Sequence, residues 1–413
     1  MDTIFALSSG LLPSGIGVIR ISGSKTRFAV ETICNFLPQP RLASLGTFRH
    51  PGTGNEIDRG IVIWFPGPKS FTGEDCAEFH IHGGAAVVSL FYSILGDIEG
   101  FRIAEPGEFS RRTFENGKMD LTELEGLSDL ISAQTEVQRD IAHRQHRGEL
   151  RAIMEDWRDQ IVRLRALVEA DLDFSDEEDV PGSVADNVWQ SAGRLAVDIG
   201  RYLDDNHRGE IIRDGFHIVI LGKPNSGKSS LMNALAKRSV AIVSEEAGTT
   251  RDLIEVHLDL GGYAVTVVDT AGIREAKDKV ETEGVRRALD RAARADLIVW
   301  LTSVDDEVED IAGDYICPVI HLRSKDDEAR FGISGVSVKR KDSLDELIDS
   351  VTKLVNTSLG RMESAPVTRE RHRNLLSSCK SSLEKAEGQE DAPIEIRAEY
   401  LRDAGDKIGR ITG

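Results

Sequence analysis

The 413-residue sequence predicts a multidomain protein of the α+β and α/β classes, with a helical domain that is interrupted by a doubly wound α/β domain. Three changes in hydrophobic pattern indicate this fold. Short apolar strands and Gly-rich turns occupy residues 1–118, and helical spacing covers 119–212 and returns over 359–413. Strands alternate with helices over 213–358. Because helices precede and follow that segment, we expect the α/β domain to be an insertion.

The N-terminal pattern favours short strands, turns and two helices. Ile16–Ile21 alternates with glycine, and Ile61–Phe65 is typical of a buried strand. The pattern changes at Asp120, after which apolar residues recur at helical spacing. Two stripes predict helix-bundle core, and they consist of Leu121, Leu124, Leu127 and Leu130, and of Leu150, Trp157, Ile161, Leu164 and Val168.

Composition limits the expected partners and location. The net charge of −19 argues against broad electrostatic binding to nucleic acid, so we expect no DNA partner and only local RNA contacts. The cysteines are scattered, which favours free thiols in a reducing compartment; they are Cys34, Cys76, Cys317 and Cys379. Since no signal-peptide pattern or membrane-length apolar run is present, we expect a cytoplasmic protein that does not bind membranes.

The segment Gly222–Ser229 fits the phosphate-loop pattern of Gly, four residues and Gly-Lys-Ser. An apolar run over Phe216–Leu221 predicts the preceding strand, and a helical stripe begins at Leu231. The backbone N–H groups of such a loop and the following helix N-terminus bind phosphate oxygens. Lys228 would reach the β- and γ-phosphates, and Ser229 would bind Mg²⁺. A Gly-rich turn can match by chance, but the strand–loop–helix context favours a nucleotide site.

Further nucleotide motifs follow in the expected order. Asp269–Gly272 ends the apolar strand Val265–Val268, where an aspartate can hold Mg²⁺ through water and a glycine N–H can contact the γ-phosphate. Gly248–Asp252 is a polar loop of the kind that folds over a nucleotide.

A base-recognition motif comes next. Ser324–Asp327 follows the strand Val319–Leu322 at the place of a guanine-reading Asn-Lys-x-Asp, and Ser337-Val338-Lys339 follows where a Ser-Ala-Lys loop supports the base. Asp327 would accept from the N1 and N2 donors of guanine and would be left unpaired opposite adenine. The set of motifs therefore predicts GTP binding.

Three positions depart from the usual pattern. Ser324 replaces Asn, Val338 replaces Ala, and Ile273 stands where Ras-like enzymes have a water-orienting Gln. A serine can make one hydrogen bond but not an amide pair, so nucleotide affinity is expected to be modest. Because isoleucine cannot orient water, hydrolysis needs another group for that task and another source of positive charge.

Long motifs outside the phosphate loop resemble those of the MnmE (TrmE) family of tRNA-modification GTPases. The resemblance covers nearly the whole chain and is carried by Asp2–Ile4, Gly15–Gly23, Ser70–Asp75, His82–Gly84, Ala104–Ser110, Asn116–Leu121 and Gly248–Asp252. It implies an N-terminal tetrahydrofolate-binding and dimerisation domain over 1–118. It also implies a helical domain in two parts, 119–212 and 359–413, and an inserted GTPase domain over 213–358.

The resemblance also implies a chemistry. These proteins act with an FAD-containing partner, MnmG, on C5 of the wobble uridine of certain tRNAs, which receives an aminomethyl or carboxymethylaminomethyl group. A 5-formyl- or methylene-tetrahydrofolate relates to the one-carbon unit. Arg20, Glu78 and Lys118 match the folate positions, where a cation suits the glutamate tail and a carboxylate suits the pterin donors. Without the resemblance, Arg20 and Glu78 would be interpreted as a structural ion pair.

For the GTPase domain, the resemblance implies K⁺-activated hydrolysis in a homodimer. The implied K⁺ ligands are Asn225, Ser244 and Thr249, and the ion supplies the charge that an arginine finger gives elsewhere. The implied Mg²⁺ ligands are Ser229, Thr250 and Asp269. Catalysis is assigned to Lys228, Thr250, Gly272 and Glu281, the last of which matches the water-orienting residue. The nucleotide would contact Asn225, Ser226, Gly227, Lys228, Ser229, Ser230, Ser244, Thr249, Thr250, Asp269, Gly272, Ser324, Lys325, Asp327, Ser337 and Lys339.

The end of the sequence differs from the family pattern. Family members end in a Phe-Cys-Ile-Gly-Lys motif whose cysteine is needed for modification, and this sequence stops at Gly413 before it. Either the natural protein is shorter or the sequence ends early. The alternative to a tRNA-modifying GTPase is a GTP-dependent switch or assembly protein, favoured if the missing motif is real. A folate module with a decaying GTPase is a third interpretation, disfavoured by the intact Lys228, Ser229 and Asp269.

Overall fold

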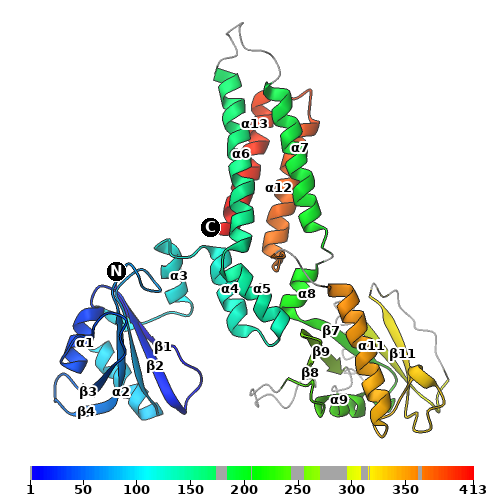
Figure 1. Ribbon diagram of the computed structural model, residues 1–413, viewed down its shortest axis with the longest axis horizontal. Helices are drawn as coiled ribbons and strands as arrows, with labels where there is room; N and C mark the ends of the chain where they lie inside the picture. Colours follow the sequence, from blue (N-terminus) through cyan, green and yellow to red (C-terminus); the bar gives the residue numbers. More distant parts are fainter. Residues whose placement is uncertain are drawn as a thin grey trace, which may run out of the picture. The chain divides into compact units, whose positions relative to one another are not determined.

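The computed structural model describes residues 2–173, 184–205, 207–242, 255–269, 295–307, 315, 317–360 and 365–413. Of these, residues 173, 184–186 and 269 are described by their backbone only. The chain forms two compact units, Met1–Leu124 and Glu125–Gly413 (Figure 1).

The first unit is built on a six-stranded sheet with the order β3-β4-β5-β2-β1-β6. Neighbouring strands are antiparallel except β1 and β6, which run parallel. The predicted strands Ile16–Ile21 and Ile61–Phe65 lie inside β2 and β4. The elements are β1 (Thr3–Leu7), β2 (Ser14–Ser22), α1 (Thr26–Cys34), β3 (Ser44–Arg49), β4 (Glu56–Phe65), β5 (Cys76–Gly83), α2 (Ala85–Gly96), β6 (Phe101–Ile103) and α3 (Glu108–Glu115).

The two faces of this sheet differ because neighbouring residues of a strand point to opposite sides. On one face, Ile19 of β2 and Phe79 of β5 belong to a buried apolar core that also contains residues of α1 and α2. Arg20 and Glu78 are the next residues along these strands, and they are direct cross-strand partners. The strand pattern therefore places this charged pair on the face opposite the core.

Residues 2–118 form three helices where the sequence pattern predicts two. The helix that the prediction missed is α3, whose sequence EFSRRTFE is mostly polar. Its buried residues include Glu108, Arg112 and Thr113, so polar contacts hold it in place. An expectation based on an apolar stripe cannot find such a helix.

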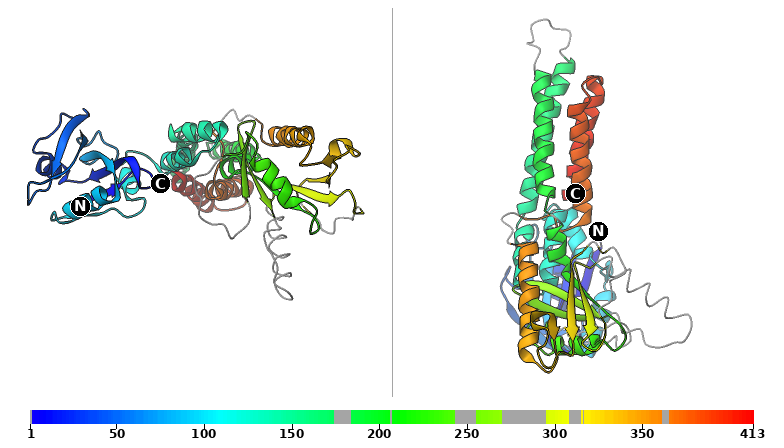
Figure 2. Two further views of the ribbon diagram at one scale, coloured as in Figure 1. Left: turned by 90° about the horizontal axis from the view of Figure 1, so that it is seen from below. Right: turned by 90° about the vertical axis from the view of Figure 1, so that its right-hand side faces the viewer.

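The second unit contains a bundle of four helices, which run side by side (Figures 1 and 2). They share one apolar core, to which the predicted stripe from Leu150 to Val168 contributes as expected. Two of the helices precede the second sheet in the chain and two follow it, so the sheet is inserted between the halves of the bundle. None of the helices in the described ranges is long and apolar enough to cross a membrane. The bundle consists of α6 (Glu149–Asp173), α7 (Val184–Leu203), α12 (Glu370–Gly388) and α13 (Ile394–Thr412).

The other predicted stripe does not form bundle core. It lies on α4 (Leu121–Ser132), and its four leucines at 121, 124, 127 and 130 are only half-buried and outside the apolar core clusters of the described residues. The expectation was wrong because ion pairs attach α4 to its surroundings. Asp129 accepts from Arg213 Nε at 3.2 Å and from Arg369 Nη2 at 2.8 Å.

The second sheet has the order β12-β11-β10-β7-β9-β8, and its strands are parallel except for the antiparallel pair of β8 and β9. Both faces are apolar: Ile218 and Ile220 of β7 belong to one core cluster, and Val219 and Leu221 to another. This pattern is that of the predicted doubly wound fold. The elements are α5 (Glu136–His146), α8 (Arg208–Asp214), β7 (Phe216–Leu221), α9 (Lys228–Ala236), β8 (Glu255–Leu260), β9 (Tyr263–Asp269), β10 (Leu297–Ser303), β11 (Val319–Ser324), β12 (Gly335–Val336) and α11 (Lys341–Leu359).

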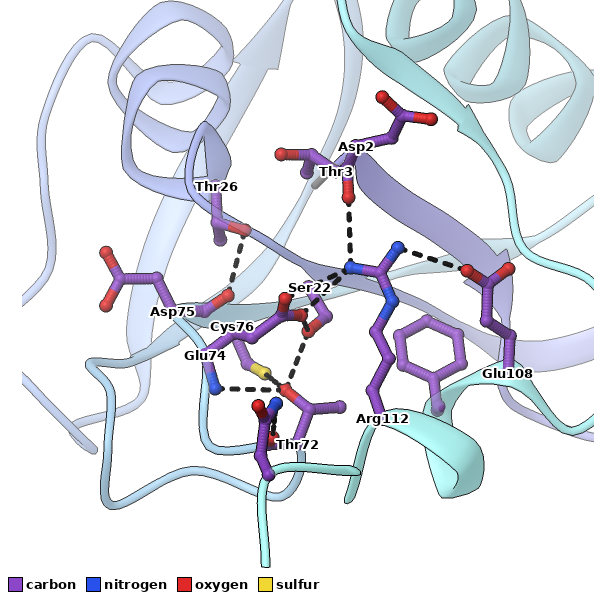
Figure 3. Close-up of polar contacts among 12 residues, drawn as sticks. Asp2, Thr3, Ser22, Thr26, Thr72, Glu74, Asp75, Cys76, Glu108 and Arg112 are labelled. Atoms are coloured by element: carbon purple, nitrogen blue, oxygen red, sulfur yellow. Dashed lines mark hydrogen bonds and ion pairs between the residues drawn. The ribbon is translucent and has the colours of Figure 1, made fainter. Parts of the chain in front are cut away.

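A buried ion network attaches α3 to the sheet of the first unit (Figure 3). Arg112 lies at its centre and donates to Glu74 Oε2 at 3.0 Å, to the backbone O of Asp2 at 2.9 Å and to Glu108 Oε1 at 3.0 Å. Glu74 also accepts from Ser22 Oγ at 2.6 Å. The network therefore joins α3, the residue that precedes β1, the end of β2 and the loop over 70–75.

Replacing Glu108 with Gln should destabilise the first unit at neutral pH. Arg102 Nη2 donates to Glu108 Oε1 at 2.6 Å, and this pairing lowers the pKa of Glu108 from 4.5 to about 2. Because the pKa of Glu108 is lower in the folded state, its ionised carboxylate stabilises the fold above the unfolded-state pKa of 4.5. This stabilisation is lost as the pH falls toward 2. We expect a loss on the order of 2 kcal/mol at pH 7, measured by amide hydrogen exchange over residues 101–115.

The matched control is Glu31→Gln in the same unit. Glu31 pairs with Arg27 at 2.9 Å, but its side chain is 44% exposed, so its loss should cost below about 0.5 kcal/mol. Equal losses in the two variants, or a loss in Glu108→Gln that does not shrink in acid, would contradict the role given to the buried carboxylate.

Candidate nucleotide site and the polar face of the first unit

The phosphate loop connects the carboxyl end of β7 to α9. Because β7 lies between β9 and β10, the loop sits at the point where the strand order reverses. Gly222 has φ 150°, Asn225 has φ 64° and Gly227 has φ 93°. A Cβ added at Gly222 would lie 2.2 Å from the backbone O of Leu301, and asparagine is a residue that tolerates the left-handed conformation. The residue types at these positions are thus the ones that the loop requires.

Lys228 is held inside this loop. The residue is 6% exposed, and Nζ donates to the backbone O of Gly222 at 2.7 Å and of Lys223 at 2.8 Å. Ser229 and Ser230 follow in the first turn of α9. An ammonium group fixed beside a helix N-terminus is well placed for phosphate oxygens.

A buried hydrogen bond joins the phosphate loop to the base-recognition motif. Ser324 ends β11, and its Oγ donates to the backbone O of Ser226 at 2.5 Å. Both residues are buried, and they are 98 positions apart in the sequence. A Cβ added at Gly227 would lie 3.8 Å from Ser324 Oγ, which shows that the serine lies directly against the loop. The bond fixes the two motifs relative to each other.

Asp327 lies in a cluster with the Ser-Val-Lys motif. Ser337 Oγ donates to Asp327 Oδ1 at 2.6 Å, and Lys339 Nζ donates to Oδ2 at 2.5 Å. Lys339, assisted by the Ser337 hydroxyl, lowers the pKa of Asp327, so the carboxyl group is ionised at neutral pH. The neighbouring Asp326 is buried and accepts from the backbone N–H of Arg330 at 2.8 Å, which holds the loop in shape.

The structure brings part of the predicted nucleotide site together. Asp269 ends β9 opposite Ile220 of β7, so its backbone lies at the same sheet edge as the phosphate loop. Its side chain is outside the described part of the chain. The residues placed at this edge are Asn225, Ser226, Gly227, Lys228, Ser229, Ser230, Ser324, Lys325, Asp327, Ser337 and Lys339. The predictions for Ser244, Thr249, Thr250, Gly272 and Glu281 fall outside the described residues and stay predictions.

Arg20 and Glu78 form an ion pair on the polar face of the first unit. Arg20 Nε and Nη2 donate to Glu78 Oε1 at 3.0 and 2.9 Å, and the side chains are 30% and 20% exposed. The guanidinium carbon lies 5.3 Å from the ring centre of Phe71 and 5.8 Å from that of Phe109. Lys118 lies beside the loop that carries Phe71, because a Cβ added at Gly73 would be 3.3 Å from its Cδ.

Sequence reasoning missed the two aromatic neighbours of Arg20. Phe71 and Phe109 belong to the family motifs, but the sequence alone gave them no role. The sequence signal that could have identified them is the aromatic residue in each of two family motifs, Ser70–Asp75 and Ala104–Ser110. The pair with Glu78 is compatible with both earlier interpretations, a structural bridge and a ligand site that is open to solvent.

The four cysteines are free, as expected. Burial raises the pKa of Cys34 and of Cys379 to about 12. Their thiols therefore stay protonated at neutral pH and are poor nucleophiles.

Comparison with known proteins gives consistent matches over the whole chain. The family model for the GTP-binding protein TrmE N-terminus matches residues 3–118, and the model for the MnmE helical domain matches residues 121–413. Two relatives called tRNA modification GTPase MnmE, from Brucella anthropi and Brucella abortus (strain 2308), are each 50% identical to this chain. Each alignment covers 100% of this chain and 94% of the relative.

Among solved structures, the G domain of the T. maritima FeoB iron transporter is similar to 33% of this chain and 97% of its own length. The identity is 23% and the TM-score is 0.24, which is too low to add to the fold described above. The two family models and the full-length relatives are decisive, and they show that the chain belongs to the MnmE (TrmE) family of tRNA modification GTPases.

Proposed function

We propose that this chain hydrolyses GTP and that the hydrolysis serves the modification of tRNA. The proposal rests mainly on one observation, the buried bond from Ser324 to Ser226 that joins a phosphate loop to a base-recognition loop at one sheet edge. A phosphate loop alone accepts any nucleoside triphosphate. The attached base loop directs the choice to guanine, and the relatives that share half of the residues carry the name of a tRNA modification GTPase.

Asp327 supports the choice of guanine over adenine. The ionised carboxylate accepts hydrogen bonds, and guanine offers donors at N1 and N2 that adenine lacks at the same positions. Opposite adenine the carboxylate would gain no donor from the base, which should favour guanine by about 1–3 kcal/mol. Ser337 and Lys339 hold the carboxylate in a fixed orientation.

Mg²⁺ would be held by Ser229, Thr250 and Asp269. Ser229 lies in the first turn of α9, and the backbone of Asp269 ends the strand beside β7, so the two residues come from one sheet edge. Oxygen ligands of this kind suit Mg²⁺. When bound, the ion neutralises charge on the β- and γ-phosphates. Lys228 lies at the same loop and contributes a fixed positive charge.

K⁺ would be bound by Asn225 together with Ser244 and Thr249. Asn225 is held in the left-handed conformation within the phosphate loop, where its amide oxygen is a suitable cation ligand. Since Ile273 cannot orient water, Glu281 is assigned that task. Thr250 and Gly272 would contact the γ-phosphate. Of all the residues named in this paragraph, Asn225 alone lies within the described part of the chain.

The polar face of the first unit would bind a folate, 5-formyl- or methylene-tetrahydrofolate. Glu78 provides a carboxylate for the pterin donors, and Arg20 and Lys118 provide cations for the glutamate tail. The rings of Phe71 and Phe109 beside Arg20 add apolar surface for a flat ligand. This combination of a few charged groups with aromatic walls is typical of cofactor sites.

The family suggests the remaining parts of the function. We propose a cytoplasmic homodimer that acts with an FAD-containing MnmG-type partner on C5 of the wobble uridine of tRNA. We also propose the domain division 1–118, 119–212, 213–358 and 359–413. The net charge of −19 favours an arrangement in which the partner provides much of the RNA contact.

GTP hydrolysis should be at least about tenfold faster in KCl than in NaCl at equal ionic strength. The reason is that the loop is proposed to hold K⁺ where its charge offsets the charge that develops on the phosphates. Asn225→Ala should remove the difference between the salts, because the proposed amide ligand is lost. Phosphate release at saturating GTP measures both effects.

The same assay tests the water-orienting residue. Glu281→Ala should keep GTP binding and lose most hydrolysis, whereas Glu283→Ala, a neighbour of the same type, should keep both. Equal rates in the two salts would exclude K⁺ activation. Normal turnover in Glu281→Ala would remove that residue from its role.

Glu78→Gln should weaken binding of 5-formyl-tetrahydrofolate to the full chain by about tenfold, because the charged acceptor for the pterin donors is lost. Isothermal titration calorimetry measures the change. Glu56→Gln on β4 is the control, since that carboxylate is 56% exposed and pairs only distantly with Arg49 at 3.9 Å. Unchanged folate affinity in Glu78→Gln, together with a lowered melting temperature, would show that the pair is structural.

A further inference from the structure

Ser324 has a single proton to donate, and the structure shows where it goes. Its Oγ lies 2.5 Å from the backbone O of Ser226 and 3.4 Å from that of Thr302. Carbonyl oxygens only accept hydrogen bonds, so the serine is the donor to either of them. Because the shorter contact is to Ser226 and the residue is 4% exposed, the proton is committed to the phosphate loop.

Guanine has acceptors, N7 and O6, on one edge and donors at N1 and N2 on another part of the ring. An amide side chain at position 324 would have two N–H donors, one for the loop carbonyl and one for a base acceptor. The Ser324 hydroxyl has no second N–H or O–H donor once it is hydrogen-bonded to the backbone O of Ser226. Its lone pairs cannot bond to N7, because N7 is itself an acceptor. Asp327, an acceptor, meets only the donor side of the base.

We propose that Ser324 positions the phosphate loop, and that the site selects guanine through Asp327 without reading N7. The inference rests on the proposed function, since it requires that guanine nucleotides bind at this sheet edge. It specifies the ligand more narrowly than that function does. Guanine nucleotides with and without a nitrogen at position 7 should bind equally well, provided that the N1 and N2 donors are intact.

The test compares GDP with 7-deaza-GDP, in which a C–H group replaces N7, by isothermal titration calorimetry on the full chain. The two dissociation constants should agree within about twofold. Ser324→Ala should weaken both nucleotides by about tenfold and leave their ratio unchanged, because the Ser226 carbonyl loses its donor. Ser324→Thr keeps the hydroxyl and should restore both affinities.

A gain of selectivity is expected from Ser324→Asn. The second N–H donor should favour GDP over 7-deaza-GDP by about three- to tenfold. Ser303→Ala is the matched control, because Ser303 is the register partner of Ser324 on β10. Its buried Oγ has no hydrogen-bond partner among the described residues, so this variant should bind both nucleotides like the wild type. Asp327→Asn should lose affinity for both.

The outcomes separate this inference from the proposed function. Wild-type binding of GDP with more than fivefold weaker binding of 7-deaza-GDP would overturn the inference and leave the function intact. A Ser324→Ala variant that binds as wild type, or that weakens GDP alone, would also overturn it. Failure of the wild type to bind either nucleotide would overturn the proposed function and the inference together.

Discussion

The hydrogen bond from Ser324 Oγ to the backbone O of Ser226 is the contact on which the candidate nucleotide site depends most. Parallel strands bring their carboxyl ends to one edge, but they do not fix the loops that leave that edge. This bond does so, because it attaches the phosphate loop to the end of β11. A buried carbonyl without a donor would cost about 1–3 kcal/mol, so the two motifs are held as one unit. This hydrogen bond explains how Ser324 can replace the asparagine that is usual at this position of the base-recognition motif.

The first unit is organised by a different constraint. Its sheet has an apolar face that joins the core with α1 and α2, and the charged pair of Arg20 and Glu78 lies on the other. Buried charges at Arg112 and Glu108 hold the polar helix α3 and the loop over 70–75 near that face. Buried ion pairs add little net stability when compared with apolar packing. Here they fix the positions of the loop that carries Phe71 and the helix α3 that carries Phe109, both beside Arg20.

Much of the second sheet could be predicted from the sequence, because its strands are continuous apolar runs and its loops carry spaced motifs. The strand Phe216–Leu221 and the phosphate loop are where the pattern indicates. The helix α3 could not be predicted, since ion pairs replace the apolar stripe that a pattern search detects. The leucines of α4 led to a wrong prediction of bundle core. They have helical spacing, but the helix is attached through the ion pairs of Asp129.

The candidate sites show the same limit. Asp327, Ser337 and Lys339 were recognised by their spacing, and the structure places them in contact. The bond between Ser324 and Ser226 joins residues 98 positions apart, and no local pattern encodes it. The roles of Thr250, Gly272 and Glu281 stay predictions, because they lie outside the described residues.

We propose that nucleotide hydrolysis at this phosphate loop serves tRNA modification. The most direct test replaces Lys228 with Ala in the gene that encodes this chain, in its own cells, and quantifies tRNA nucleosides by mass spectrometry. Lys228 is buried within the loop, and its loss removes the fixed charge that is proposed to bind the phosphates. Modification of the wobble uridine should fall to the level of a strain without the gene, at unchanged protein abundance. Modification at the wild-type level would contradict this proposal.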